Sequence, residues 1–575
     1  MIKTLGKSIR EYKWAAILSP LCMVGEVYME TKIPRVLSQI VDQGVTPGDM
    51  GAVFGNGLLL VIFSILSLCF GVASAYFASS AGTGFAKNLR HDMFYKVQDF
   101  SFSNIDHFSS ASIVTRLTTD VSNVQMAFQM MTRIMVRAPL MLLFSLVMVI
   151  RLSPQLSLIF LCAVPILGCG IFIIMRKSFP AFEKMFKTYD KLNNVVQENL
   201  RGIRVVKSYV REEYESKKFG DVANDIYDLS CRAERIMSFS MPLMQLCIYA
   251  SMILISWFGA RLVVVGNLST GDLTSVFSYS MQILMSLMMV SMSIVMVTMS
   301  KASAERIVEV LDEVSDLANP AEPVMEVKDG SITFQNVDFS YSKDPEKLAL
   351  SGVNLTILSG QTVGILGGTG SSKSSLVQLI PRLYDVTNGA VLVGGVDVRD
   401  YDLTNLRDSV AMVLQKNELF SGTIKENLRW GNPDATDEEL VHACKLACAD
   451  EFIQSFPDKY DTYIEQGGTN VSGGQKQRLC IARALLKKPK ILILDDSTSA
   501  VDTRTDALIR QAFREELPST TKLIIAQRVS SVQDADQIII LDNGRVHAVG
   551  THEELLTSNQ IYQEVYYSQQ KGGLK

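Results

Sequence analysis

Six apolar stretches in the first 300 residues constrain the fold of this 575-residue chain more than any other feature. A bilayer crossing requires about 20 mostly apolar residues, and each stretch reaches about that length. We therefore predict six membrane-spanning helices, at about residues 14–41, 55–81, 134–152, 156–178, 240–265 and 272–299. The remainder, after residue 320, has the composition of an ordinary soluble domain, so the chain divides into two or three domains.

The charges between these stretches predict which side of the membrane each linker occupies. The segment 82–133 contains five Lys and Arg residues and the segment 179–238 contains eleven, whereas residues 42–55 contain none. Positively charged loops stay in the cytosol, so we place both long linkers there, as helical extensions of the spans, together with both chain ends. Residues 1–13 alternate basic and apolar side chains, which predicts an interfacial elbow helix; the alternative is a charged flank of the first span.

Two carboxylates lie inside the first apolar stretch. Glu26 and Glu30 are four residues apart and therefore share one face of a helix. Ionisable groups inside a membrane are costly and commonly face a cavity or a partner, so both are candidates for the substrate path. Pairing with Lys32, Arg133 or Arg137 is an equal alternative.

Methionines recur along the sixth stretch with helical spacing. Methionine is flexible and polarisable, which suits a surface that accepts varied apolar guests. The candidate residues for such a substrate path are Met281, Met285, Met288, Met292 and Met296, with Met299 on the same stripe. Ordinary helix packing explains the same pattern.

A glycine-rich segment in the second half predicts a phosphate-binding loop. The apolar strand Val363–Leu366 leads into it, and a helix is expected to begin near Lys373. Backbone N–H groups of such a loop bind phosphate oxygens, while Lys373 neutralises the outer phosphates and the Ser374 hydroxyl binds Mg²⁺. The expected nucleotide contacts are Gly367, Gly368, Thr369, Gly370, Ser371, Ser372, Lys373, Ser374 and Ser375.

Further motifs follow in a fixed order. Gln415 comes after the loop, Val-Ser-Gly-Gly-Gln occupies residues 471–475, and the apolar strand Ile491–Leu494 ends in Asp495. This order resembles that of ABC exporters, and the resemblance covers essentially the whole chain. It implies an all-α transmembrane domain of six helices followed by an α/β P-loop nucleotide-binding domain. The expected parts are an elbow helix at 1–13, a transmembrane domain with coupling extensions at 14–318, a linker at 319–326 and the nucleotide-binding domain at 327–575.

The resemblance also implies roles for individual residues. Tyr341 matches the aromatic residue that stacks on adenine, although a core tyrosine at a strand end would look the same. Gln415 and Asp495 match residues that act with Ser374 at Mg²⁺, and Asp502 matches the residue at the dimer seam. The signature residues, which in the family act on the nucleotide of the partner subunit, are Ser472, Gly473, Gly474 and Gln475.

Two segments of the long linkers are similar to the coupling turns of ABC exporters. They occupy residues 103–106, followed by 115–120, and residues 198–209. In that family each turn contacts an ATPase domain and transmits its movement. The alternative is a solvated helical hairpin.

Three residues depart from the family pattern. Ser372 replaces a glycine, Asp496 replaces the catalytic Glu, and Gln527 replaces the switch His. Aspartate retracts the carboxylate by roughly 1–1.5 Å, and a displacement near 1 Å can lower a rate about a hundredfold. Glutamine can donate a hydrogen bond but cannot carry a proton as histidine does. We therefore predict a site that binds ATP and hydrolyses it poorly; the alternative is that Asp and Gln suffice.

The intact signature and the altered hydrolytic pair together predict asymmetry. Two identical copies would have no competent site, so we expect a second, non-identical half-transporter as partner, with ATP and Mg²⁺ as cofactors. The predicted function is export of small hydrophobic or amphipathic compounds across a lipid membrane. The expected location is a bacterial plasma membrane. The alternatives are a lipid or peptide translocator and an ATP-gated channel or regulatory subunit. The net charge of −4 does not indicate a nucleic-acid partner.

Overall fold

The computed structural model describes residues 1–496 and 500–572, which form two compact units. The first unit comprises Met1–Gln98 and Ser110–Glu313, and its described residues are helical or lie in turns. Its helices are α1 (Ile2–Lys7), η1 (Arg10–Tyr12), α2 (Lys13–Gln39), η2 (Ile40–Val45), α3 (Met50–Gln98), α5 (Ser110–Thr115), η3 (Arg116–Asp120), α6 (Val121–Leu152), α7 (Pro154–Arg201), α8 (Ile203–Ser208), α9 (Glu212–Met237), α10 (Ser240–Val264) and α11 (Thr270–Asp312).

Five helical segments among the described residues are long and apolar enough to cross a membrane. They are Met50–Gln98, Ser110–Leu152, Pro154–Arg201, Glu212–Val264 and Thr270–Asp312. These five segments include the positions of five of the six expected spans. Helix α2, at the position of the first expected span, is not among them, because Glu26, Glu30, Lys32 and Arg35 make its second half polar. Its 27 residues extend over about 40 Å, so α2 as a sixth span stays a prediction.

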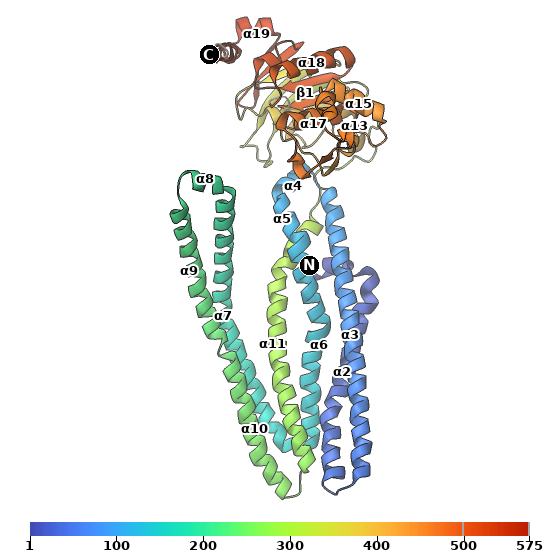
Figure 1. The fold of residues 1–575 in the computed structure, drawn as a ribbon, viewed down its shortest axis with the longest axis vertical. Helices are drawn as coiled ribbons and strands as arrows, with labels where there is room; N and C mark the ends of the chain where they lie inside the picture. Colours follow the sequence, from blue (N-terminus) through green and yellow to red (C-terminus); the bar gives the residue numbers. More distant parts are fainter. Residues whose placement is uncertain (497–499, 573–575) are drawn as a thin grey trace. The chain divides into compact units, whose positions relative to one another are not determined.

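The long helices of the first unit continue well beyond a membrane thickness. Helix α2 packs against α3 and α6, and α11 packs against α6 and α2. Helices α7 and α9 form an antiparallel hairpin with α8 at its tip (Figure 1). This hairpin contains the second predicted coupling turn, and its helices have the helical character expected of the long linker.

Residues 1–13, which were expected to form one elbow helix, instead form two short helices, α1 and η1. Helix α1 ends at Lys7, and Arg10 has a φ of 43°, which a continuous helix cannot contain. Contacts with α3 explain the break: the Ser8 hydroxyl donates to Asp92 Oδ2 at 2.8 Å, and Asn88 Nδ2 donates to the Ser8 carbonyl at 3.0 Å. Ser8 is therefore bound to α3.

The second unit comprises Asp99–Ser109 and Val314–Lys575 and contains three sheets. Its strands are β1 (Ile332–Phe339), β2 (Leu350–Ile357), β3 (Thr362–Leu366), β4 (Asn388–Val393), β5 (Val396–Asp397), β6 (Val410–Val413), β7 (Gly422–Thr423), β8 (Tyr463–Ile464), β9 (Ile491–Asp495), β10 (Thr521–Ile525), β11 (Gln537–Asp542) and β12 (Arg545–Gly550). Its helices are α4 (Phe102–Phe108), α12 (Lys373–Gln378), α13 (Leu403–Ser409), α14 (Ile424–Arg429), α15 (Asp437–Leu446), α16 (Asp450–Gln454), η4 (Lys459–Asp461), η5 (Gln466–Gly468), α17 (Gly473–Leu485), α18 (Thr503–Glu516), η6 (Val529–Ser531), α19 (His552–Ser558) and α20 (Gln560–Gly572).

The six-stranded sheet positions the site. Its order is β12-β11-β3-β10-β9-β6, and only the pair of β11 and β12 is antiparallel among its described pairs. Strands β3, β9 and β10 are almost entirely buried, as expected for parallel strands covered on both faces. Because their carboxyl ends meet at one edge, the loops after β3, β9 and β10 converge there.

Helix α4, the first predicted coupling turn, belongs to the second unit. The Ser103 hydroxyl donates to Asp316 Oδ2 at 2.7 Å, and the Tyr384 hydroxyl donates to Asp106 Oδ2 at 2.7 Å. Burial, together with the Asp106 carboxylate, raises the pKa of the Tyr384 phenol, which therefore remains a hydrogen-bond donor. These contacts hold the turn against the β-rich part of the chain.

Candidate functional site

The glycine-rich loop lies between β3 and α12, and the helix begins at Lys373 as predicted. A side chain at Gly367 would place its Cβ 2.3 Å from the Leu541 carbonyl oxygen, so only glycine fits there. The Lys373 amine donates to the carbonyl oxygens of Gly367 at 2.8 Å and Gly368 at 2.9 Å. Burial lowers the pKa of Lys373, and the Asp495 and Asp496 carboxylates oppose this shift. The loop therefore surrounds a positive charge, which fits an anionic phosphate.

Ser372 occupies the left-handed region of backbone conformation. Its φ is 68° and its ψ is 28°. A side chain in this region costs about 1–2 kcal/mol relative to glycine. This positive φ gives the physical reason why the motif has glycine at this position.

Asp495 and Ser374 form the group that fits Mg²⁺. Asp495 ends β9, and its Oδ1 accepts a hydrogen bond from the Ser374 hydroxyl at 3.0 Å. Gln415, after β6, lines the same cleft. Hydroxyl, amide and carboxylate oxygens are hard ligands of the kind that Mg²⁺ takes alongside phosphates and water, so the donors fit. No cluster of three or more His, Cys, Asp or Glu suited to a metal occurs among the described residues.

Asp496 and Gln527 contact each other directly. Gln527 Nε2 donates to Asp496 Oδ2 at 2.8 Å. Strands β9 and β10 pair in parallel with Asp495 opposite Ile525, which brings the two following loops together. Burial raises the pKa of Asp496, while the hydrogen bond from Gln527 and the charge of Lys373 oppose the rise. The two residues that depart from the family pattern, Asp496 and Gln527, are therefore hydrogen-bonded to each other.

Tyr341 lies beside the loop. Its hydroxyl is 2.8 Å from Ser375 Oγ, and its ring meets the Phe339 ring edge-on at 4.7 Å between centroids. The residue is 49 % exposed, so part of the ring is free to contact a base. Stacking on adenine stays a prediction.

A cleft of about 450 Å³ brings the predicted nucleotide contacts together. All the loop residues from Gly367 to Ser375 line it, with Gln415, Asp495, Asp496 and Gln527. Among the described residues, those of the signature do not line this cleft. The glycine-rich loop, Asp496 and Gln527 therefore line the same cleft, whereas the described signature residues lie outside it.

The signature begins a well-capped helix, α17. Ser472 Oγ accepts from the backbone N–H of Gln475 at 3.3 Å, and Gln475 Oε1 accepts from the N–H of Ser472 at 2.8 Å. This reciprocal pair is a capping box, which fixes the first turn. Asp502 is the N-cap of α18 and accepts a hydrogen bond from the Thr505 N–H, and the Ala500 N–H before it donates to Gln477 Oε1 of α17 at 3.0 Å. The signature and the predicted dimer seam are thus held together.

Helix α20 contributes cleft residues that the sequence analysis did not assign. Ile561, Tyr562 and Val565 line the cleft beside Gln527. Gln569 of the same helix bonds to the backbone of Gln527 and Val529. The amphipathic spacing of the three apolar residues signals a packed helix, but nothing in the sequence indicates what it packs against.

In the first unit, the two carboxylates of α2 pair with one arginine. Arg137 of α6 forms an ion pair with Glu26 and a second one with Glu30, at 2.7 Å to Glu30 Oε2. The Lys32 amine lies 5.2 Å from the centre of the Tyr28 ring. The structure thus shows the pairing alternative with Arg137, and contact with substrate stays a prediction.

The methionine stripe of α11 is only partly as expected. Met288 packs against the buried cluster that contains Leu167, and Met296 is partly buried. Among the described side chains of α11, the exposed methionines are Met281, Met285, Met289 and Met292; the side chain of Met299 lies outside the described residues. An apolar hollow of about 730 Å³ lies between α7 and α11, and its described lining includes none of the predicted methionines.

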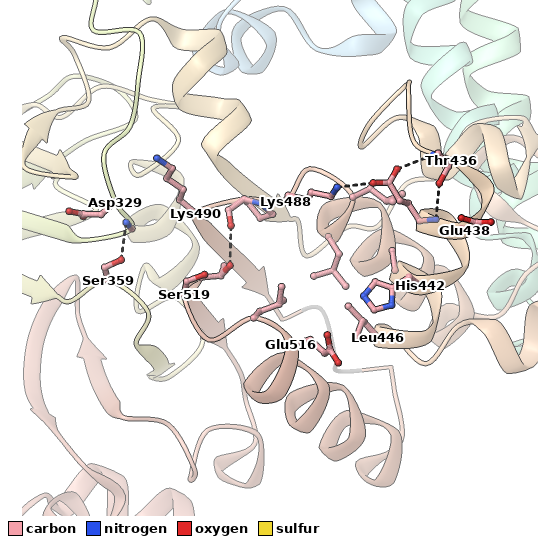
Figure 2. A pocket seen from close by; sticks show the side chains of 18 of the residues that line it. Asp329, Ser359, Thr436, Glu438, His442, Leu446, Lys488, Lys490, Glu516 and Ser519 are labelled. Atoms are coloured by element: carbon pink, nitrogen blue, oxygen red, sulfur yellow. Dashed lines mark hydrogen bonds and ion pairs between the residues drawn. The ribbon is translucent and has the colours of Figure 1, made fainter.

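A larger cavity, of about 810 Å³, lies at the opposite end of the six-stranded sheet, where β9 and β10 begin (Figure 2). Three lysines line it: Lys488 binds Glu439 at 2.7 Å, the Lys490 amine donates to backbone carbonyls, and Lys328 is exposed. Acidic side chains, among them Glu438 and Glu516, share the lining. The lining is therefore of mixed charge, and among the described residues it includes no glycine-rich loop like that after β3.

Comparison with known proteins adds independent evidence. The chain is 36 % identical over 561 residues to YfiB of Bacillus subtilis (strain 168), an ABC transporter ATP-binding protein, covering 98 % of this chain and 97 % of that one. It is 32 % identical over 477 residues to the fatty acid ABC transporter ATP-binding/permease protein of Mycobacterium bovis, covering 83 % of this chain and 75 % of that one. A bacterial Atm1-family ABC exporter, solved with ATP bound, superimposes with a TM-score of 0.82 at 25 % identity, over 98 % of each chain.

Two family models match the two halves of the chain. The ABC transporter transmembrane region matches residues 17–287, and the ABC transporter model matches residues 350–499. The second match contains the glycine-rich loop, the signature and Asp495. The chain therefore belongs to the ABC transporter family, and it joins an exporter-type membrane domain and an ATP-binding domain as a half-transporter does.

Proposed function

We propose that this chain is one subunit of a heterodimeric ABC exporter of hydrophobic or amphipathic compounds, with six spans and with both termini in the cytosol of a bacterium. The main support for two unequal ATP sites is the hydrogen bond from Gln527 to Asp496 at 2.8 Å. Both side chains stand at positions where hydrolysis requires a catalytic base and a proton-carrying switch.

The cleft retains what nucleotide binding requires. Lys373, Ser374 and Asp495 supply a cation, a hydroxyl and a carboxylate within one loop cluster. ATP with Mg²⁺ would supply the phosphoryl group and the metal charge on which this chemistry depends. The Asp496 carboxylate is one methylene short of the family base, and one of its oxygens already accepts from Gln527. It is therefore poorly placed to orient an attacking water, and hydrolysis here is slow.

The signature serves a second site. Its capped first turn presents backbone N–H groups, which suit an anionic phosphate, and it does not line the cleft of its own chain. We infer that Ser472 to Gln475 complete a nucleotide site whose P-loop, base and switch belong to a different subunit. That partner has the catalytic Glu and the switch His that this chain lacks.

The apolar surface of the membrane domain supports a hydrophobic cargo. Exposed methionines on α11 and the hollow between α7 and α11 offer adaptable, non-polar contacts. A lipid translocator is the second candidate, because one relative, 32 % identical over 83 % of this chain, is a fatty acid ABC transporter protein. ATP-dependent uptake into inside-out vesicles of a hydrophobic dye or of a labelled fatty acid separates the two.

The central test measures ATP binding and turnover by the full-length chain purified alone in lipid nanodiscs. We expect Mg²⁺-dependent ATP binding, loss of binding in Lys373→Ala, and turnover at least about tenfold below that of a symmetric exporter. Addition of the cognate subunit should raise turnover. Brisk hydrolysis by the chain alone would contradict the heterodimer.

A further inference from the structure

Helix α20 is anchored firmly to the nucleotide-binding domain at its start. Tyr562 is 1 % exposed, belongs to the main hydrophobic core, and its hydroxyl lies 2.5 Å from His552 Nδ1. Asn559, just before the helix, accepts a hydrogen bond from the Tyr562 N–H at 2.9 Å and places its amide 3.0 Å from His547 Nδ1. The first turn of the helix is therefore fixed relative to the sheet.

Two turns later, one glutamine of α20 reaches the loop after β10. Gln569 Nε2 donates to the carbonyl oxygen of Gln527 at 2.8 Å, and the backbone N–H of Val529 donates to Gln569 Oε1 at 2.9 Å. The Gln569 side-chain amide thus bonds to one backbone carbonyl before Arg528 and one backbone N–H after it. This is the donor and acceptor pattern of a neighbouring β-strand. Loss of this amide would leave both backbone groups without these partners.

The backbone held in this way is the one that bears the altered switch residue. Gln527 is exposed, and its side chain donates to Asp496 at the end of the cleft. Ile561 and Val565, on the same helix as Gln569, line that cleft. The contacts therefore run without interruption from α20, through the backbone of Gln527, to Asp496.

We propose that Gln569 is a positioning residue for the nucleotide site: it holds residues 527–529 in place, keeps Gln527 on Asp496 and so slows nucleotide release. Val529, at the end of this segment, is buried in the main hydrophobic core. The side chains of Gln527 and Arg528 are exposed, so Gln569 acts on the exposed part of the segment, next to Asp496. This inference rests on the proposed role of the cleft as an ATP site. It adds that retention of the nucleotide depends on the C-terminal helix.

The test uses the full-length chain in nanodiscs and the dissociation of a fluorescent ATP analogue with Mg²⁺, followed after a chase with unlabelled ATP. Removal of two hydrogen bonds in Gln569→Ala should speed dissociation about threefold to tenfold. The matched control is Gln570→Ala, because the Gln570 amide donates to Tyr566 within the same helix. That variant should release nucleotide at the wild-type rate.

A second pair of variants separates positioning from general stability. If Gln569 acts through the Gln527 side chain, Gln569→Ala should have no further effect on dissociation in a Gln527→Ala background. Equal acceleration in both backgrounds, or an unchanged rate in Gln569→Ala with normal binding, overturns the inference. Gln569→Glu, which can accept from Val529 but cannot donate to Gln527, should also release faster. A wild-type chain that fails to bind the analogue would instead contradict the proposed function.

Discussion

Gln527 Nε2 donates a hydrogen bond to Asp496 Oδ2 at 2.8 Å, so the two residues that differ from the family's hydrolytic pair bind each other. The parallel register of β9 and β10 makes the contact possible, because it places Asp495 opposite Ile525. Both residues line the cleft after β3.

Restoring the family pair should restore hydrolysis. We expect Asp496→Glu combined with Gln527→His to raise ATP turnover of the chain alone about tenfold to a hundredfold, because the longer carboxylate reaches the attacking water and the imidazole can carry a proton. Phosphate release in nanodiscs measures this. Addition of Lys373→Ala should abolish the gain. Unchanged turnover in the double variant would show that hydrolysis is limited elsewhere.

Glycine at position 372 should relieve backbone strain. Ser372 has a φ of 68°, for which glycine gains about 1–2 kcal/mol; the greater freedom of glycine in the unfolded chain offsets about 0.4–1 kcal/mol. We expect Ser372→Gly to raise the free energy of unfolding by up to about 1.5 kcal/mol, measured as a higher midpoint of thermal unfolding. Ser371→Gly, at a position without positive φ, should give no such gain.

The pH dependence of stability should reveal the buried carboxylate of Asp495. Burial raises its pKa above the ordinary value of 3.8, so its ionisation opposes folding. This loss is absent below the ordinary pKa and appears as pH rises through the raised pKa. Asp495→Asn should therefore be more stable than wild type at pH 7.5, by an amount that shrinks toward pH 4. Thermal unfolding between pH 4 and 8 tests this.

That variant should at the same time lose Mg²⁺-dependent ATP binding, since the carboxylate is the charged ligand of the group. A stability difference that grows as pH falls would contradict the assigned direction of the pKa shift.

Loss of the α17 cap should act on both stability and partner hydrolysis. Ser472→Ala removes an N-cap, which costs about 1 kcal/mol, and alters the signature turn. In the two-subunit complex we expect ATP turnover to fall more than tenfold. Thr436→Ala removes an equivalent capping box from α15 and should cost similar stability with turnover unchanged. If Ser472→Ala and Thr436→Ala lowered ATP turnover equally, the loss would come from reduced stability and not from the signature.

The ion-pair cluster of α2 and α6 should be sensitive to removal of its single cation. Arg137→Ala leaves Glu26 and Glu30 without a counter-charge in a partly buried site, which costs about 3–5 kcal/mol. Thermal unfolding in detergent should show the loss, and Glu26→Gln with Glu30→Gln should recover part of it. Arg133→Ala, one turn earlier in α6, is the control and should have little effect.

Features that depend on neighbours in sequence could be predicted. The strand that ends at Leu366, the loop, and the helix that begins at Lys373 follow from local rules of polarity and glycine content. Five apolar segments also have the length and composition of membrane spans. The positive φ of Ser372 could be anticipated, because the motif has glycine at that position.

Features that depend on distant contacts could not be predicted. Gln569 and Gln527 are 42 residues apart, and a hydrogen bond between a side chain and a backbone leaves no periodic pattern. Which of Met288 and Met289 is buried depends on the rotation of α11 against its neighbours, not on composition. The sequence offered Arg137 as one of three possible partners of Glu26 and Glu30, but the choice among them depends on how α6 packs against α2.

The grouping of residues 99–109 with the ATPase unit has a practical consequence for domain grafting. A chimera cut only at the end of α11 would separate Ser103 and Asp106 from Asp316 and Tyr384, the side chains that hold them. An exchangeable module must therefore be discontinuous in the gene and carry the eleven-residue insert along with the C-terminal half.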